Sequence, residues 1–172
     1  MTQATRYALA LLLTLAGTGA CAQTQTTEKL SKRFGESLNL YFYKNTLRML
    51  NQKEDKDFDE LIKDVEKMRF LMIDKSDRFS AADYKSILSD YQREDYEEMM
   101  TSRHDGKRFD VYIREANGQV KGTVILVNDS TNLFVLDILG KVAINKAASL
   151  FNALDESSDI GKKIKDFTKS VD

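Results

Sequence analysis

The stretch Tyr96–Leu139, YEEMMTSRHDGKRFDVYIREANGQVKGTVILVNDSTNLFVLDIL, decides the fold of this 172-residue chain. It contains four strand-like segments separated by turn-forming residues. Asn117-Gly118 is the strongest turn signal, because both residue types tolerate the positive φ angles of a two-residue hairpin turn. Asp105-Gly106 has the same chemistry, and Asn128-Asp129-Ser130 gives a looser turn. The stretch therefore predicts an antiparallel meander with strands at 96–103, 108–115, 120–127 and 132–139.

The strands of this meander differ in the residues that they place on their two faces. In 108–115, apolar Phe109, Val111 and Ile113 alternate with polar neighbours that begin with Asp110, which is typical of a strand with one face in water. The next two strands are apolar on both faces, so a second layer must cover the other side of the sheet. Gly122, in the middle of a strand, indicates a bulge or a close packing contact.

The rest of the chain predicts helices and further strands around the meander. Leu30 and Phe34 indicate a short first helix that ends near Gly35, after a flexible leader at 23–27. Residues 38–45 favour a strand, while the following TLRMLNQ also fits a helix. Asp57 with Glu60, and Ser80 with Asp83, have the spacing of helix N-terminal capping boxes. Hydrophobic periodicity then predicts a strand at 69–74 and helices at 58–67, 81–91 and 142–154.

These elements predict one α+β domain over residues 28–155. We expect an antiparallel sheet of four to six strands, with amphipathic helices packed mainly on one face. Charged residues make up 31% of the chain and nearly cancel to a net charge of −1, so no nucleic-acid partner is expected.

The amino-terminal residues 1–22 predict a signal peptide. Arg6 precedes Ala8–Ala20, an apolar run that is too short to span a bilayer. Two maturation routes fit the sequence: cleavage after Ala22, or acylation of Cys21 as in a bacterial lipoprotein. Both predict export to the periplasm or cell envelope, and neither leaves a cysteine pair for a disulfide, since Cys21 is the only cysteine.

No catalytic or metal-binding arrangement can be recognised in the sequence. His104 is the only histidine, and a turn histidine without further ligands favours simple exposure over a metal site. Two acidic groups lack the spacing of a calcium loop, so we interpret them as solvated charge. They are Glu94, Asp95, Glu97 and Glu98, and Glu54, Asp55, Asp57 and Asp59. We expect no cofactor.

The carboxyl-terminal residues 156–172 predict one more amphipathic helix. Its apolar stripe consists of Ile160, Ile164, Phe167 and Val171, and lysines occupy other parts of its surface. Two interpretations remain open: the stripe packs on the second face of the sheet, or it docks onto a membrane or a partner protein.

Three motifs are notable in and after the meander: the Tyr-Glu-Glu entry at Tyr96, the Asp-Gly turn at Asp105, and the Leu-x-x-Leu-Gly-Lys motif at Leu136–Lys141. With these motifs the sequence resembles the bacterial family labelled domain of unknown function 4252. The resemblance covers roughly residues 28–155. It implies an exported protein, often a lipoprotein, of Gram-negative bacteria, and it brings no functional residues with it.

The sequence therefore favours a non-catalytic exported protein that binds another envelope protein or a small ligand. Two alternatives stay open. One is a membrane-surface lipoprotein that uses Cys21 and the carboxyl-terminal helix, and the other is a small envelope hydrolase that uses carboxylates with Tyr112 or His104.

Overall fold

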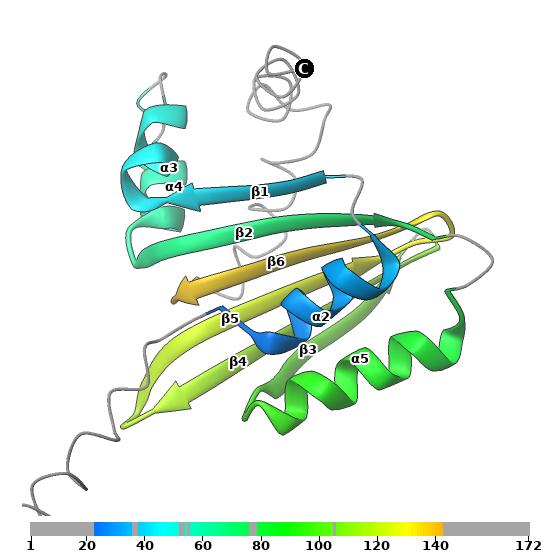
Figure 1. Cartoon of the computed structure of the whole chain (residues 1–172). Helices are drawn as coiled ribbons and strands as arrows, with labels where there is room; N and C mark the ends of the chain where they lie inside the picture. Colours follow the sequence, from blue (N-terminus) through cyan, green and yellow to red (C-terminus); the bar gives the residue numbers. More distant parts are fainter. Residues whose placement is uncertain are drawn as a thin grey trace, which may run out of the picture.

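The computed structural model describes residues 23–35, 38–51, 54, 56–75, 79–104 and 106–142. These residues form a six-stranded antiparallel sheet with the strand order β1-β2-β6-β5-β4-β3 and four helices (Figure 1). The strands are β1 (Leu38–Tyr43), β2 (Val65–Asp74), β3 (Glu97–His104), β4 (Lys107–Ala116), β5 (Gln119–Asn128) and β6 (Asn132–Gly140). The helices are α2 (Gln25–Phe34), α3 (Lys44–Leu50), α4 (Lys56–Ile62) and α5 (Ala81–Arg93).

The predicted meander is confirmed as β3-β4-β5-β6. Asn117 and Gly118 have φ angles of 54° and 69°, so the β4–β5 turn has the predicted positive-φ conformation. β2 extends the sheet by pairing with β6, and β1 pairs with β2. The α5 connection therefore carries the chain from β2 across the meander to the far edge strand β3.

Gly122 lies both at a bulge and at a close packing contact, the two explanations that its position in the strand indicated. The β4–β5 register shifts between Arg114 and Glu115, opposite Gly122. A Cβ atom on Gly122 would also lie 2.3 Å from the hydroxyl oxygen of Tyr96, which packs directly over the strand. Only glycine leaves room for this ring.

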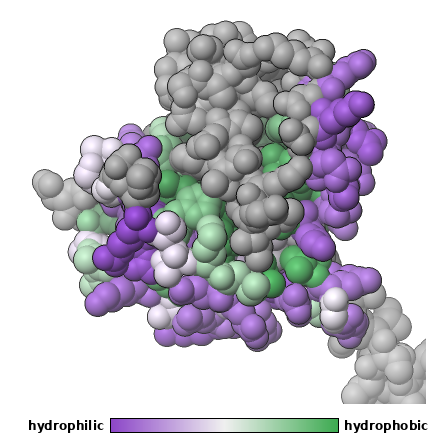
Figure 2. All heavy atoms as spheres, turned by 180° about the vertical axis from the view of Figure 1, so that it is seen from behind, coloured by the Kyte–Doolittle hydropathy of each residue, from purple (hydrophilic) through white to green (hydrophobic). Residues whose placement is uncertain are grey.

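The helices cover both faces of the sheet, so the expectation of helices mainly on one face is corrected. α2 and α5 lie in front of the sheet in Figure 1 and share a core cluster that includes Leu30, Tyr84 and Tyr91. α3 and α4 contribute Leu47 and Phe58 to the cluster on the opposite face. Figure 2 views the molecule from that opposite side, where hydrophobic residues gather between hydrophilic margins.

The helix expected at 58–67 is too long. α4 begins at Lys56, one residue before the predicted cap Asp57, and ends at Ile62; β2 then starts at Val65. Val65 and Met68 fit the apolar face of a helix, but a β-bulge between Val65 and Lys67 lets both be buried from a strand. A helix and a bulged strand give the same spacing of apolar residues here, so the predicted boundary between α4 and β2 is wrong.

The remaining predictions concern α5, the start of α2, the segment that forms α3, and the helix at 142–154. The helix at 81–91 is confirmed as α5, and Ser80 and Asp83 form its predicted capping box. Residues 23–27, expected to be a flexible leader, instead contain the N-cap and first turn of α2. The segment TLRMLNQ, which fits a helix by its sequence, contributes to helix α3. Most of the helix predicted at 142–154 lies outside the described residues.

Candidate functional site

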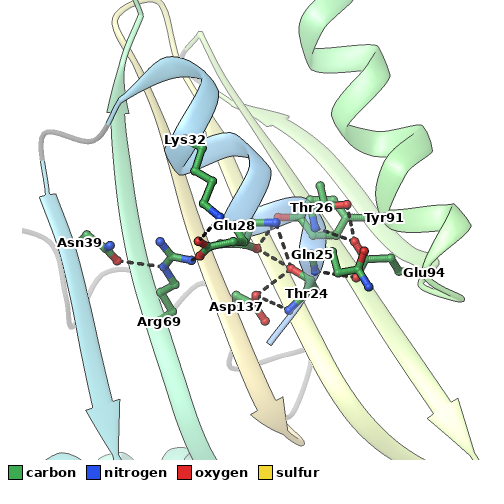
Figure 3. A network of polar contacts seen from close by, with 11 residues as sticks. Thr24, Gln25, Thr26, Glu28, Lys32, Asn39, Arg69, Tyr91, Glu94 and Asp137 are labelled. Carbon is green, nitrogen blue, oxygen red and sulfur yellow. Dashed lines mark hydrogen bonds and ion pairs between the residues drawn. The ribbon is translucent and has the colours of Figure 1, made fainter. Parts of the chain in front are cut away.

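The polar residues at the start of α2 form a partly buried network of hydrogen bonds and ion pairs that links α2 to the sheet and to the end of α5 (Figure 3). Thr24 is the N-cap of α2 and is 3% exposed. Its backbone N–H and its hydroxyl both donate to Oδ2 of Asp137 in β6, at 3.0 and 2.7 Å. The beginning of α2 is therefore fixed to the centre of the sheet by a residue 113 positions away.

A second carboxylate caps the same helix end. Glu94 follows α5, and its oxygens accept from the backbone N–H groups of Gln25 at 2.8 Å and Thr26 at 2.6 Å. The hydroxyl of Thr26 donates to the same carboxylate at 2.6 Å. Because free N–H groups and the positive end of the helix dipole meet at an N-terminus, two carboxylates are stabilised there. Glu94 is thus a helix cap, and the interpretation of its acidic group as solvated charge is wrong for this residue.

Asp137 and Tyr91 are buried too deeply to meet a substrate directly. Asp137 is 1% exposed and Tyr91 is 0% exposed. Burial raises the pKa of Asp137 despite its hydrogen bonds from Thr24, and burial also raises the pKa of the Tyr91 phenol. The Tyr91 hydroxyl and the Thr27 hydroxyl lie 2.9 Å apart. This arrangement holds α2 and α5 on the sheet, and it offers no exposed acid or base.

Arg69 extends the network from α2 to β1. Its guanidinium is 3% exposed, and it donates to Oδ1 of Asn39 and to Oε2 of Glu28, both at 2.9 Å. The guanidinium carbon also lies 5.1 Å from the centre of the Tyr41 ring. A buried arginine therefore joins three elements and keeps β1 beside α2.

A surface depression of about 510 Å³ lies where the start of α2 meets β1 and β2. We refer to this depression, together with the adjoining residue Tyr43, as the β1 surface. Tyr41 is 43% exposed and Tyr43 is 57% exposed. The Lys67 ammonium lies 5.2 and 5.4 Å from the centres of these two rings, within cation–π range.

The β1 surface is predominantly positive. Among the described residues that line the depression, four are bases and Glu28 is the only carboxylate. Glu28 forms ion pairs with Lys32 and Arg69, and these contacts lower its pKa. Lys67 has no carboxylate partner within the described ranges. The other two lining bases are Lys29 and Lys32. Exposed tyrosines are typical of a surface that recognises another molecule, because tyrosine is enriched at protein interfaces.

Of the two residues suggested for catalysis, Tyr112 is described in full and His104 only in its backbone. Tyr112, expected together with Asp110 on a wet strand face, is fully buried, and so is Asp110. Tyr112 donates to Glu98 at 3.2 Å, and burial raises the pKa of its phenol, which favours the protonated form. His104 ends β3, opposite Lys107, and its side chain lies outside what the structure describes.

The structure gives no position for the other predicted sites. Cys21 and the stripe of Ile160, Ile164, Phe167 and Val171 lie outside the described residues. Within the described ranges, no group of His, Cys, Asp and Glu side chains is arranged to hold a metal ion. Among the same residues, no helix is both long and apolar enough to cross a membrane.

Sequence reasoning missed the two buried aspartates. Asp137 interrupts the apolar run LFVLDILG, and a lone acid within a strand that is apolar on both faces was a usable signal. The Thr24, Thr26 and Thr27 hydroxyls that meet the carboxylates were read as part of a polar leader. Helix-capping residue types directly before a periodic segment would have been the signal for them.

Comparison with known proteins places the chain in a family. No curated protein and no solved structure matches it. The family model described as "Domain of unknown function (DUF4252)" matches residues 34–150, which is more than half of the chain. Asp137 and Glu94 lie within the matched range, whereas the threonines at the start of α2 precede it. The chain therefore belongs to this family of unknown function.

Proposed function

We propose that this chain is a non-catalytic exported protein of the bacterial envelope that binds an extended, acidic segment of another protein along β1. The observation that carries the proposal is the β1 surface, where two exposed tyrosines lie beside Lys67 at an edge of the sheet. Export is supported by the signal-peptide pattern of residues 1–22.

The position and sequence of β1 support the binding of an extended chain. Among the described strands, β1 has a neighbour only on its β2 side. An edge strand offers unpaired backbone N–H and C=O groups, and natural edge strands often carry charges or proline that discourage pairing. β1, LNLYFY, has neither. A partner strand added to β1 would gain backbone hydrogen bonds, with specificity from the alternating side chains.

The charge of the β1 surface supports an acidic partner. Lys29, Lys67 and Lys32 surround the depression with Arg69, against the single carboxylate of Glu28. Since opposite charges steer association and set specificity, an acidic segment fits better than a basic one. The hydrogen bond from Arg69 to Asn39 holds β1 in place before binding, which lowers the ordering cost.

Site-specific photo-crosslinking in cells tests this function. A photoreactive residue at Tyr43 is expected to crosslink to a discrete envelope protein. The same residue at Met99, which is 47% exposed on the opposite edge strand β3, serves as the matched control and is expected not to do so. Charge reversal by Lys67→Glu should weaken the crosslink about tenfold, as expected for a residue at the centre of an interface. Lys121→Glu on β5 should leave it unchanged.

Two results would refute the proposal: no crosslink from Tyr43, or the same products from Tyr43 and Met99. If a product forms, its crosslinked segment can be synthesised as a peptide and titrated against the purified protein. Slower exchange of β1 amide hydrogens on binding is expected for strand addition. Unchanged exchange in β1 would show that the partner uses the tyrosines without extending the sheet.

A further inference from the structure

A second positively charged depression lies at the other end of the α2/α5 face. It has a volume of about 570 Å³ and is formed by the amino-terminal end of α5, the β3–β4 turn and the β5–β6 turn. Four bases line it, namely Lys85 from α5, Arg103 from β3, and Lys107 and Arg108 from β4. We call this depression the hairpin-tip site. It is distinct from the β1 surface and shares no lining residue with it.

Three of these four cations have no carboxylate partner among the residues that the structure describes. Arg108 is paired with the buried Asp110, with its Nε 2.8 Å from Oδ2. Among the described residues that line the site, Asp129 is the one carboxylate, and it accepts from the backbone N–H groups of Thr131 and Asn132 at 2.7 Å each. Lys85, Arg103 and Lys107 make no ion pair within the described ranges. The described lining of the site therefore carries more positive than negative charge.

The strand register makes this charge unfavourable for the fold itself. Arg103 of β3 lies directly opposite Arg108 of β4. Like charges on directly opposed residues of an antiparallel pair destabilise the sheet. Lys85 then adds a third positive charge from α5, which is a separate part of the chain. Packing does not explain this convergence, because each added cation increases the repulsion that folding must overcome.

A buried polar atom in the same site also lacks a partner. Asn128 lies opposite Arg108 across the β4–β5 ladder and lines the depression. Its Oδ1 atom is buried and has no hydrogen-bond partner among the described residues. A buried polar group without a partner costs stability, and a bound ligand can supply the missing hydrogen bond.

We infer that the hairpin-tip site binds a phosphate-type anion. The arginine guanidinium matches the geometry of phosphate oxygens, and lysine ammonium groups add charge without a fixed direction. The Oδ1 atom of Asn128 can accept a hydrogen bond from a protonated phosphate oxygen, or from a hydroxyl group of the alcohol that is esterified to the phosphate. The same chemistry occurs in soluble phosphate compounds and in the headgroups of anionic phospholipids.

Titration of the purified protein tests the inference with two probes. The first is inorganic pyrophosphate, titrated against sodium chloride at matched ionic strength to remove general screening. The second is vesicles of phosphatidylcholine with and without phosphatidylglycerol. The double variant Lys85→Gln/Lys107→Gln is compared with Lys44→Gln/Lys121→Gln, which removes equal charge outside the site. Arg103→Gln is the third variant.

The double variant at the site is expected to weaken binding at least tenfold, and the control pair less than twofold. Arg103→Gln should also weaken binding. Its thermal unfolding temperature should stay the same or rise, because the repulsion with Arg108 is relieved; a purely structural Arg103 would give the opposite sign.

The two probes separate the sources of the ligand. Binding of pyrophosphate that depends on the site supports a soluble phosphate compound. Binding to phosphatidylglycerol vesicles alone, again dependent on the site, supports a lipid headgroup. The inference is overturned if neither probe binds above the chloride reference, or if both double variants weaken binding equally.

Discussion

Asp137 and Asp110 are two fully buried carboxylates on the same face of the sheet, and they are stabilised in different ways. Asp110 accepts from Nε of Arg108 at 2.8 Å and from its Nη2 at 3.0 Å, together with hydroxyl donors from Tyr84 and Thr101. Asp137 has no ion pair within the described ranges and depends on the N–H and hydroxyl groups of Thr24.

The difference shows which part of the fold each aspartate controls. Arg108 is 27% exposed, so it can reach water if Asp110 is lost. Asp137 instead holds the positive end of α2, whose released N–H groups have no comparable exit. Asp110 thus stabilises a local ion pair beside the hairpin-tip site, while Asp137 holds a helix onto the sheet beside the β1 surface.

The largest effect is expected from Asp137→Ala. It should lower the free energy of unfolding by about 3 kcal/mol, because it leaves two buried donors of Thr24 unsatisfied. Asp110→Ala should cost less, about 2 kcal/mol, since Arg108 can turn toward solvent. Chemical denaturation measures both values. Hydrogen exchange should accelerate in the first turn of α2 for Asp137→Ala only, and equal exchange in the two variants would remove the distinction.

A smaller difference in the free energy of unfolding is expected between the threonines that donate hydrogen bonds to these carboxylates. Thr24→Ala removes both the N-cap of α2 and one donor to Asp137, so a loss of about 2 kcal/mol is expected. Thr101 is exposed and donates to Asp110 at 2.6 Å, so Thr101→Ala should cost about 0.5 kcal/mol. Thermal and urea unfolding of both variants check the order. A Thr101→Ala loss equal to that of Thr24→Ala would mean that the two clusters are equivalent.

The smallest effect is expected in the pH dependence of Asp137→Asn. Burial raises the pKa of Asp137 in the folded state above its ordinary value of 3.8. At pH values between these two pKa values, the folded protein binds more protons than the unfolded chain. The stability of the wild type relative to Asp137→Asn should therefore decrease as the pH rises from 3.8 through the folded-state pKa, and should be constant outside that window.

Glu28→Gln provides a control of opposite sign. Hydrogen bonds from Lys32 and Arg69 lower the pKa of Glu28 in the folded state. Its contribution is present above the ordinary pKa of 4.5 and is lost as the pH falls through the folded-state value. Urea unfolding between pH 3 and pH 7 measures both profiles. Two profiles with the same slope would contradict the assignment for one of these carboxylates.

Much of the meander could be predicted because its signals are local. Asn117-Gly118 fixes the central hairpin through its own φ angles, and Ser80 with Asp83 fixes the start of α5 through contacts within one turn. The strand boundaries predicted for β4, β5 and β6 differ from the observed ones by one residue at most. These turn and cap signals come from residues at most three positions apart, so they can be recognised in the sequence.

The candidate sites could be predicted only in part. A turn at Asp105-Gly106 is predicted from the sequence, but Lys85 lies beside the neighbouring bases only because α5 crosses the sheet. Tyr41 and Tyr43 were recognised in a strand, yet their position at the sheet edge depends on the pairing of β1 with β2. Periodicity shows which residues share a face, and it does not show which strand is last in the sheet.

The sequence by itself determined the antiparallel meander, its turns and the α5 cap, because each depends on neighbours in the chain. Only the tertiary structure decided that Asp110 and Asp137 are buried and that residues 25–27 belong to a helix that its N-cap Thr24 fixes on the sheet. The physical reason is the same in each case. A carboxylate enters the interior only when donors meet it there, and Thr24 and Tyr84 reach their aspartates from segments that are distant in the sequence.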